Sequence, residues 1–108
     1  MSLTLTDVFI ARADTTLTET LSEITDIEFL IKAGKMGQHS KSRTFWVKEI
    51  EKRKNRLDRK LDFAAQQISQ IGNPPKTLSH TFATAKKRKM VVKGRMTKLQ
   101  NQLIPAKK

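Results

Sequence analysis

Two carboxylates one helical turn apart, Asp58 and Asp62, come nearest to a catalytic or metal-binding pair. Side chains four residues apart lie on one face of a helix, so these two could share a proton or a cation. Basic residues stand between and beside them, at Arg56, Arg59 and Lys60. Because carboxylates interleaved with cations form ion pairs along a helix, the sequence predicts that role for both aspartates.

The other residues that could support chemistry are few and scattered. The chain has no cysteine, which excludes a thiol nucleophile, a disulfide and a sulfur-ligated zinc site. Its two histidines, His39 and His80, have no metal-ligand spacing, and residues 34–37 (GKMG) lack the spacing of a phosphate-binding loop. We therefore expect a protein that is not an enzyme, with no cofactor and no bound metal.

Positive charge is the strongest chemical signal in the chain. There are 22 Lys+Arg against 10 Asp+Glu in 108 residues, a formal net charge of +12. Residues 1–31 contain six acidic residues and one basic residue, whereas residues 32–108 carry 21 basic and four acidic residues. This asymmetry predicts an acidic element that faces a basic one, within one molecule or between subunits. The excess of positive over negative charge predicts a polyanionic partner.

The densest basic segment is residues 51–60, with six cations in ten positions. On a helix, Lys52, Arg56 and Arg59 share one stripe, bounded by Phe45 and Phe63, which lie eighteen residues or about five turns apart. Cations neutralise phosphates, and exposed rings stack on unpaired bases. The alternative is that both rings widen the apolar face of the helix, which removes the stacking role. The sequence leaves these two interpretations open.

A second basic segment begins at residues 86–89 (KKRK) and extends to Lys98. Helical geometry spreads consecutive charges around the axis, so these residues cannot all contact one partner face. The alternative role for such a segment is a solvated surface that maintains solubility. The predicted phosphate contacts of the two segments are Lys52, Arg56, Arg59, Lys60, Lys86, Lys87, Arg88, Lys93, Arg95 and Lys98.

Apolar residues that recur at heptad spacing predict the elements that carry these charges. Three helices are expected at residues 4–34, 42–71 and 78–103, followed by a basic tail at 105–108. The threonine-rich stretch at residues 14–16 leaves open whether residues 1–13 continue the first helix. Gly34 and Gly37 mark its end, Ser40 or Ser42 caps the second helix, and residues 72–75 (GNPP) end it.

The third helix is expected to begin after a cap at Thr77 or Ser79. Two lysines, Lys54 and Lys89, fall on the apolar seams. We expect their stems to lie along apolar surface while each ammonium group reaches solvent or a carboxylate. Trp46 lies beside the seam and is expected to pack in the core or against a partner.

Short connections place successive helices antiparallel. The sequence thus predicts one all-α domain over residues 1–108, an elongated up-down-up three-helix bundle of coiled-coil type, in which the second and third helices form an antiparallel hairpin. Its apolar content of 37% indicates a thin core, which favours an elongated shape or a partner.

The function expected from these features is binding of a DNA or RNA backbone, independent of base sequence, by a small subunit of a larger nucleoprotein assembly. The alternative is a structural or adaptor subunit, for example of a virion, that acts through helix–helix contacts with other subunits or with itself. A protein bound to a membrane surface is a third alternative, disfavoured because the apolar faces suit other helices better than lipid.

The sequence shows no signal peptide and no long apolar run. An intracellular location is expected: cytoplasm, nucleoid or viral particle, or the nucleus in a eukaryote. No membrane partner is predicted.

Overall fold

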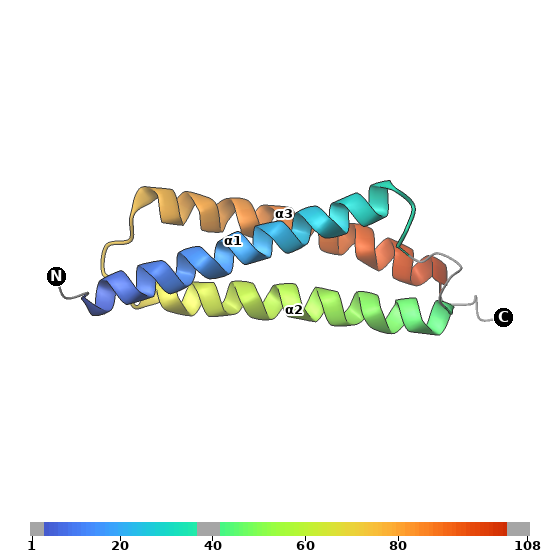
Figure 1. The fold of residues 1–108 in the computed structure, drawn as a ribbon, viewed down its shortest axis with the longest axis horizontal. Coiled ribbons are helices and arrows are strands. Elements are labelled where there is room, and N and C mark those ends of the chain that lie inside the picture. Colours follow the sequence, from blue (N-terminus) through green and yellow to red (C-terminus); the bar gives the residue numbers. More distant parts are fainter. Residues whose placement is uncertain (1–3, 37–41, 104–108) are drawn as a thin grey trace.

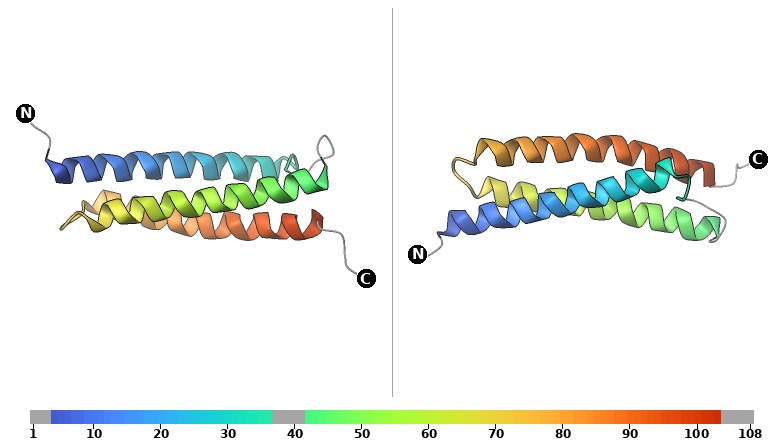
Figure 2. Two further views of the ribbon diagram at one scale, coloured as in Figure 1. Left: turned by 90° about the horizontal axis from the view of Figure 1, so that it is seen from below. Right: turned by 45° about the horizontal axis from the view of Figure 1, so that its top comes forward.

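The computed structural model describes residues 4–36 and 42–103, which form three helices: α1 (Leu5–Lys32), α2 (Arg43–Ser69) and α3 (Lys76–Leu103). The helices run up, down and up along a body of 61 × 26 × 19 Å (Figure 1). Each helix packs against both others, and the described ranges contain no strand (Figure 2). The prediction of an elongated all-α three-helix bundle is confirmed.

Helix α1 begins at Leu5, where a capping box fixes its start. Thr4 accepts a hydrogen bond from the Asp7 backbone N–H at 3.0 Å, and Asp7 accepts one from the Thr4 backbone N–H at 3.1 Å. The helix continues through the threonine-rich stretch at 14–16, so residues 5–13 belong to it. At the other end Gly34 adopts a left-handed φ of 69°, and the backbone N–H groups of Gly34 and Lys35 donate to the carbonyls of Ile31 and Leu30.

The start of α2 agrees with the sequence prediction, whereas the start of α3 does not. Ser42 caps α2 as expected, since its hydroxyl accepts from the Phe45 backbone N–H at 3.0 Å. The cap predicted for α3 at Thr77 or Ser79 is wrong, because α3 already begins at Lys76. The backbone N–H of Ser79 donates to the carbonyl of Pro75, and the fixed φ of proline suits the residue that precedes a first turn. Gly37, His39, Ser40 and the tail at 105–108 lie outside the described residues.

The apolar core has two parts with different side-chain sizes. The part near the start of α1 contains three alanines among its buried residues, including Ala64 and Ala85. The part near the end of α1 contains larger side chains, and Trp46 packs against it half-buried. Thr20, a polar exception in the first seam, is fully buried, and its hydroxyl donates to the carbonyl of Thr16 at 2.7 Å. The core thus follows the heptad rows, and the buried Thr20 hydroxyl is satisfied within its own helix.

Candidate functional site

Two of the predicted phosphate contacts on α2 face α1 and meet its glutamates. The Arg56 guanidinium donates to the Glu23 carboxylate at 3.1 Å. The Lys60 ammonium lies 3.7 Å from Glu23 and 3.8 Å from Glu19. Because α1 is acidic and lies beside α2, it neutralises cations that the linear sequence leaves without a counter-charge. The acidic and basic elements therefore face each other within one molecule.

A third predicted contact, Arg88 on α3, also faces α1. Its guanidinium donates to the Glu28 carboxylate at 2.7 Å and to the Thr25 hydroxyl at 3.1 Å. Arg95 lies two turns further along the same side of α3, is exposed, and has no ion pair within residues 4–36 and 42–103. The side of α3 that faces α1 therefore holds one paired and one unpaired arginine.

A fourth predicted contact, Lys93, pairs with Asp58 across the α2–α3 interface. The Lys93 ammonium donates to Asp58 at 2.7 Å, and the Lys89 ammonium lies 3.1 Å from the other carboxylate oxygen. Burial raises the pKa of Asp58, but the hydrogen bonds and charges of the two lysines outweigh it and hold that pKa below its ordinary value. Asp58 thus acts between helices, whereas the sequence predicted pairs within α2. Asp62 is exposed and has no ion pair in the described part of the chain.

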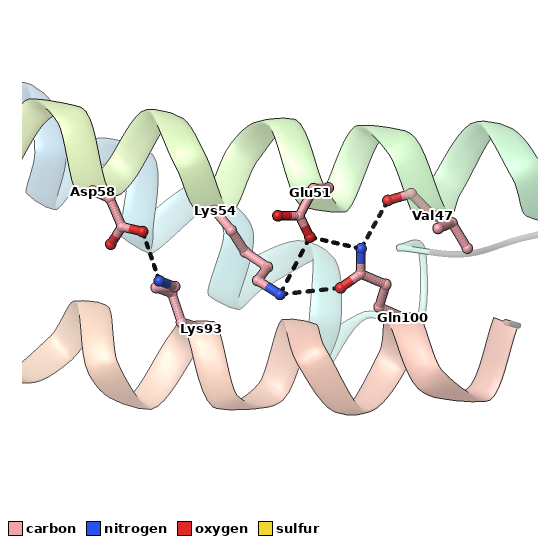
Figure 3. Close-up of polar contacts among 6 residues, drawn as sticks. All are labelled: Val47, Glu51, Lys54, Asp58, Lys93 and Gln100. Carbon is pink, nitrogen blue, oxygen red and sulfur yellow. Dashed lines mark hydrogen bonds and ion pairs between the residues drawn. The ribbon is translucent and has the colours of Figure 1, made fainter.

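Next to this pair, a polar network joins α2 to α3 inside the interface (Figure 3). Gln100, only 9% exposed, donates to the Val47 carbonyl at 3.1 Å and to the Glu51 carboxylate at 3.0 Å. Lys54 donates to the Gln100 side-chain oxygen at 3.0 Å and lies 3.5 Å from Glu51. The Gln100 hydrogen bond and the Lys54 charge lower the pKa of Glu51. Both seam lysines, Lys54 and Lys89, therefore reach a carboxylate, as expected.

Six of the ten predicted contacts remain exposed and make no ion pair with any residue that the structure describes. They divide between two helices and do not form one surface. Lys52 and Arg59 point outward from α2. By helical spacing, Lys86 lies on the side of α3 that faces α2, together with Lys93. Lys87 and Lys98 lie on the side of α3 that faces neither of the other helices. The six residues are Lys52, Arg59, Lys86, Lys87, Arg95 and Lys98.

The outward face of α2 carries the most uniform set of these cations. Lys48, Lys52 and Arg59 share it by helical spacing, and Lys48 is exposed as well. Three acidic residues lie between them in the sequence, and all are engaged: Glu49 accepts from Arg53 at 2.9 Å, Glu51 belongs to the polar network, and Asp58 pairs with Lys89 and Lys93. We call the three residues Lys48, Lys52 and Arg59 the α2 cation row.

Phe45 and Phe63 lie beside the α2 cation row and are 41% and 43% exposed. The Phe45 ring meets Trp46 edge-on, with ring centroids 5.4 Å apart. Phe63 lies at a shallow hollow shared with α1 residues Ala11 and Thr15. Each ring is thus partly covered and partly exposed, so neither of the two interpretations that the sequence left open is excluded.

Two features of this region have weak or no sequence signals. Gln100 lies one turn after Met96 but belongs to neither heptad row of α3, so the sequence gives no signal of its contacts across the interface. The pairing of α1 glutamates with α2 and α3 cations has only a general signal in the charge asymmetry of the chain. Which cations are neutralised depends on the relative rotation of the helices.

The described residues contain no group of three or more His, Cys, Asp or Glu side chains arranged to hold a metal ion. Within them, no helix combines the length and the apolar character needed to cross a membrane. Comparisons with protein-family models, with curated proteins and with solved structures found no match to this chain.

Proposed function

We propose that this protein is a non-enzymatic subunit that binds the backbone of a nucleic acid through the α2 cation row. The observation that supports the proposal is the exposure of Lys48, Lys52 and Arg59 on one face, each without an ion pair among the described residues. Cations that already pair with carboxylates contribute little to the affinity for a nucleic acid, because the existing ion pair must first be broken. The four paired residues Arg56, Lys60, Arg88 and Lys93 are therefore assigned to the stability of the bundle.

The dimensions of the α2 cation row suit a strand of nucleic acid. At a rise of about 1.5 Å per residue, the row extends about 16 Å along the helix. Phosphate contacts of this kind position a protein without selecting a base sequence. Since one ring flanks the row at each end, unpaired bases that stack on Phe45 or Phe63 would add affinity. We therefore expect single strands to bind more tightly than duplexes of the same length.

Electrophoretic titration of the full chain with single- and double-stranded DNA and RNA, at two salt concentrations, tests the proposal. Three phosphate contacts predict a slope of log affinity against log salt of about −2 for a single strand. Affinity should thus fall about 20-fold between 50 and 200 mM salt. Absence of binding at the lower salt concentration, or affinity that does not respond to salt, would contradict the proposal.

A charge-reversal pair locates the binding face. Lys52→Glu with Arg59→Glu should reduce affinity at least about 100-fold, because two attractive contacts become repulsive. The matched control is Lys35→Glu with Lys76→Glu, which makes the same change in net charge at exposed, unpaired positions away from the α2 cation row. The control should lose no more than about fivefold. Equal losses in both variants would overturn the assignment to this face.

Phe63→Leu tests the role of the ring. Leucine keeps an apolar side chain at the hollow beside Ala11 and Thr15 but removes the aromatic face. Affinity for single strands should fall about fivefold or more, since one stacked base is worth roughly 1–3 kcal/mol, while duplex affinity should stay constant. An equal effect on single strands and duplexes would contradict stacking.

A further inference from the structure

A hollow between the first half of α1 and the second half of α2 brings an arginine beside an aromatic ring. Its α2 wall is Phe63, which is 43% exposed. Its α1 wall is Ala11, Arg12, Thr15 and Thr16. Apart from Arg12, the α1 side chains are short. The hollow therefore offers one aromatic surface and one cation from two different helices.

Ion pairs between the two helices show how the residues of this hollow are aligned. The Lys60 ammonium lies 3.8 Å from Glu19, which places these two residues level with each other. Helices α1 and α2 run antiparallel (Figure 1), so moving forward along α2 corresponds to moving backward along α1. Phe63, one turn after Lys60, is therefore level with Thr16. Arg12 lies one turn beyond Thr16 in the same direction.

Arg12 has no counter-charge in the described part of the chain. It is the only basic residue among the first 31, is exposed, and makes no ion pair within residues 4–36 and 42–103. The acidic residues near it on α1 are turned away or engaged. Asp7 and Asp14 line a separate hollow that α1 forms with the start of α3, and Glu19 faces Lys60. Arg12 is thus available to an anion.

The α2 side of the hollow has the same character. Arg59, the last residue of the α2 cation row, lies one turn before Phe63, about 6 Å along the helix axis. The carboxylate next to Phe63 in the sequence, Asp62, follows Asp58 by one turn on the side of α2 that turns toward α3. The ring therefore lies between two exposed arginines, Arg59 on α2 and Arg12 on α1.

A cation beside a ring suits a nucleotide better than it suits a simple anion. The planar guanidinium of arginine binds phosphate oxygens through paired N–H groups. The exposed surface of Phe63 can hold an unpaired base by stacking. A phosphate ion or an acidic peptide would use Arg12 and leave the ring without a partner.

We propose that this hollow holds one nucleotide of a bound single strand, with its base against Phe63 and its phosphate on Arg12. The inference rests on the proposed function, because the strand reaches the hollow from Arg59 at the end of the α2 cation row. The strand thus passes from α2 onto α1, and Arg12 adds a fourth phosphate contact to the three of the row. Arg12 is not one of the ten contacts predicted from the sequence, since the rest of its segment is acidic.

The experiment measures the affinity of the full chain for an oligothymidine strand as a function of salt. Four phosphate contacts predict a slope of log affinity against log salt of about −3, compared with about −2 for the α2 cation row alone. Arg12→Gln should return the slope to about −2 and lower the affinity about fivefold or more at about 50 mM salt. Arg12→Lys should keep the steeper slope, because it keeps the charge.

The matched control is Arg95→Gln. It removes the same side chain at an exposed, unpaired position on α3, away from the hollow and from the α2 cation row. It should leave the slope unchanged and lower the affinity no more than about twofold. Helix content by circular dichroism shows that each variant is folded.

A strand of the same length that lacks its bases separates the contribution of the ring from that of the arginine. Arg12→Gln should weaken binding of both strands, whereas Phe63→Leu should weaken binding of oligothymidine alone. When the two substitutions are combined, the loss of affinity for oligothymidine should be at least about threefold smaller than the product of the single losses, because both act on one nucleotide.

The possible failures of the two proposals differ. Absence of binding by the wild-type protein at low salt would overturn the proposed function and this site with it. Suppose instead that the wild type binds and that Lys52→Glu with Arg59→Glu weakens binding. The nucleotide site alone is then wrong if Arg12→Gln has no larger effect than Arg95→Gln. It is also wrong if the losses from Arg12→Gln and Phe63→Leu simply multiply in the combined variant.

Discussion

The cations of α2 fall into an inward and an outward group that differ in their electrostatic partners. Lys54, Arg56 and Lys60 face the neighbouring helices, and each lies within 4 Å of a glutamate. Lys48, Lys52 and Arg59, on the opposite side of the same helix, have no such partner among the described residues. The two groups are interleaved along the sequence and have the same residue types. Orientation alone therefore separates cations that stabilise the fold from cations that are available to a partner.

The largest stability effect is expected at Gln100, the nearly buried centre of the inward network. Gln100→Ala removes three hydrogen bonds and leaves the Lys54 ammonium and the Val47 carbonyl without that partner. We expect a loss of about 1–3 kcal/mol in the free energy of unfolding, measured by urea titration. The control is Gln102→Ala, an exposed position on α3, which should change stability by less than about 0.5 kcal/mol. Equal effects would show that Gln100 has no special structural role.

A smaller effect is expected at Asp58, which neutralises Lys89 and Lys93 at partly exposed positions. Asp58→Asn should lower the free energy of unfolding by about 1 kcal/mol, since solvent screens part of the attraction. Asp62→Asn provides a matched comparison, because Asp62 lies one turn further along α2, exposed and unpaired in the described chain. Its effect should be below about 0.5 kcal/mol. A larger loss of stability in Asp62→Asn than in Asp58→Asn would contradict a stabilising role for the ion pairs of Asp58.

The contribution of Asp58 to the free energy of unfolding should disappear at acidic pH. The pKa of Asp58 is lower in the folded protein than in the unfolded chain, so its stabilisation is complete above the unfolded value and is lost as pH falls through the folded value. The stability difference between wild type and Asp58→Asn should therefore be constant near neutral pH and shrink below about pH 4. Thermal unfolding of both proteins at a series of pH values from 7 to 2.5 measures this stability difference. A difference that persists at the lowest pH would assign the effect of the substitution to packing.

The smallest stability effect is expected in the outward group. Lys52→Ala with Arg59→Ala should change the free energy of unfolding by no more than about 0.5 kcal/mol, because neither side chain has an ion pair to lose. The same variant should weaken nucleic-acid binding in the titration described above. Substantial destabilisation would mean that the outward cations have a structural role that the geometry does not indicate.

The helical architecture could be predicted from sequence because it depends on local patterns. Heptad rows such as Leu17 and Ile24 identify the buried faces, and both of these side chains are fully buried. Ser42 and Gly34 mark helix ends through their own backbone preferences. The predicted start of α3 is wrong because Pro75, and not a hydroxyl residue, precedes the helix, whereas the two candidate caps, Thr77 and Ser79, lie inside its first turn.

Three amphipathic helices, their order and the excess of positive charge follow from the order of residues alone, because spacing along one helix fixes which residues share a face. Which cations are neutralised depends on how the three helices pack. Arg56 and Arg59 are three residues apart on the same helix, yet one meets Glu23 and the other meets solvent. The physical reason is that an ion pair requires approach within about 4 Å, and that approach depends on how the helices are rotated against each other.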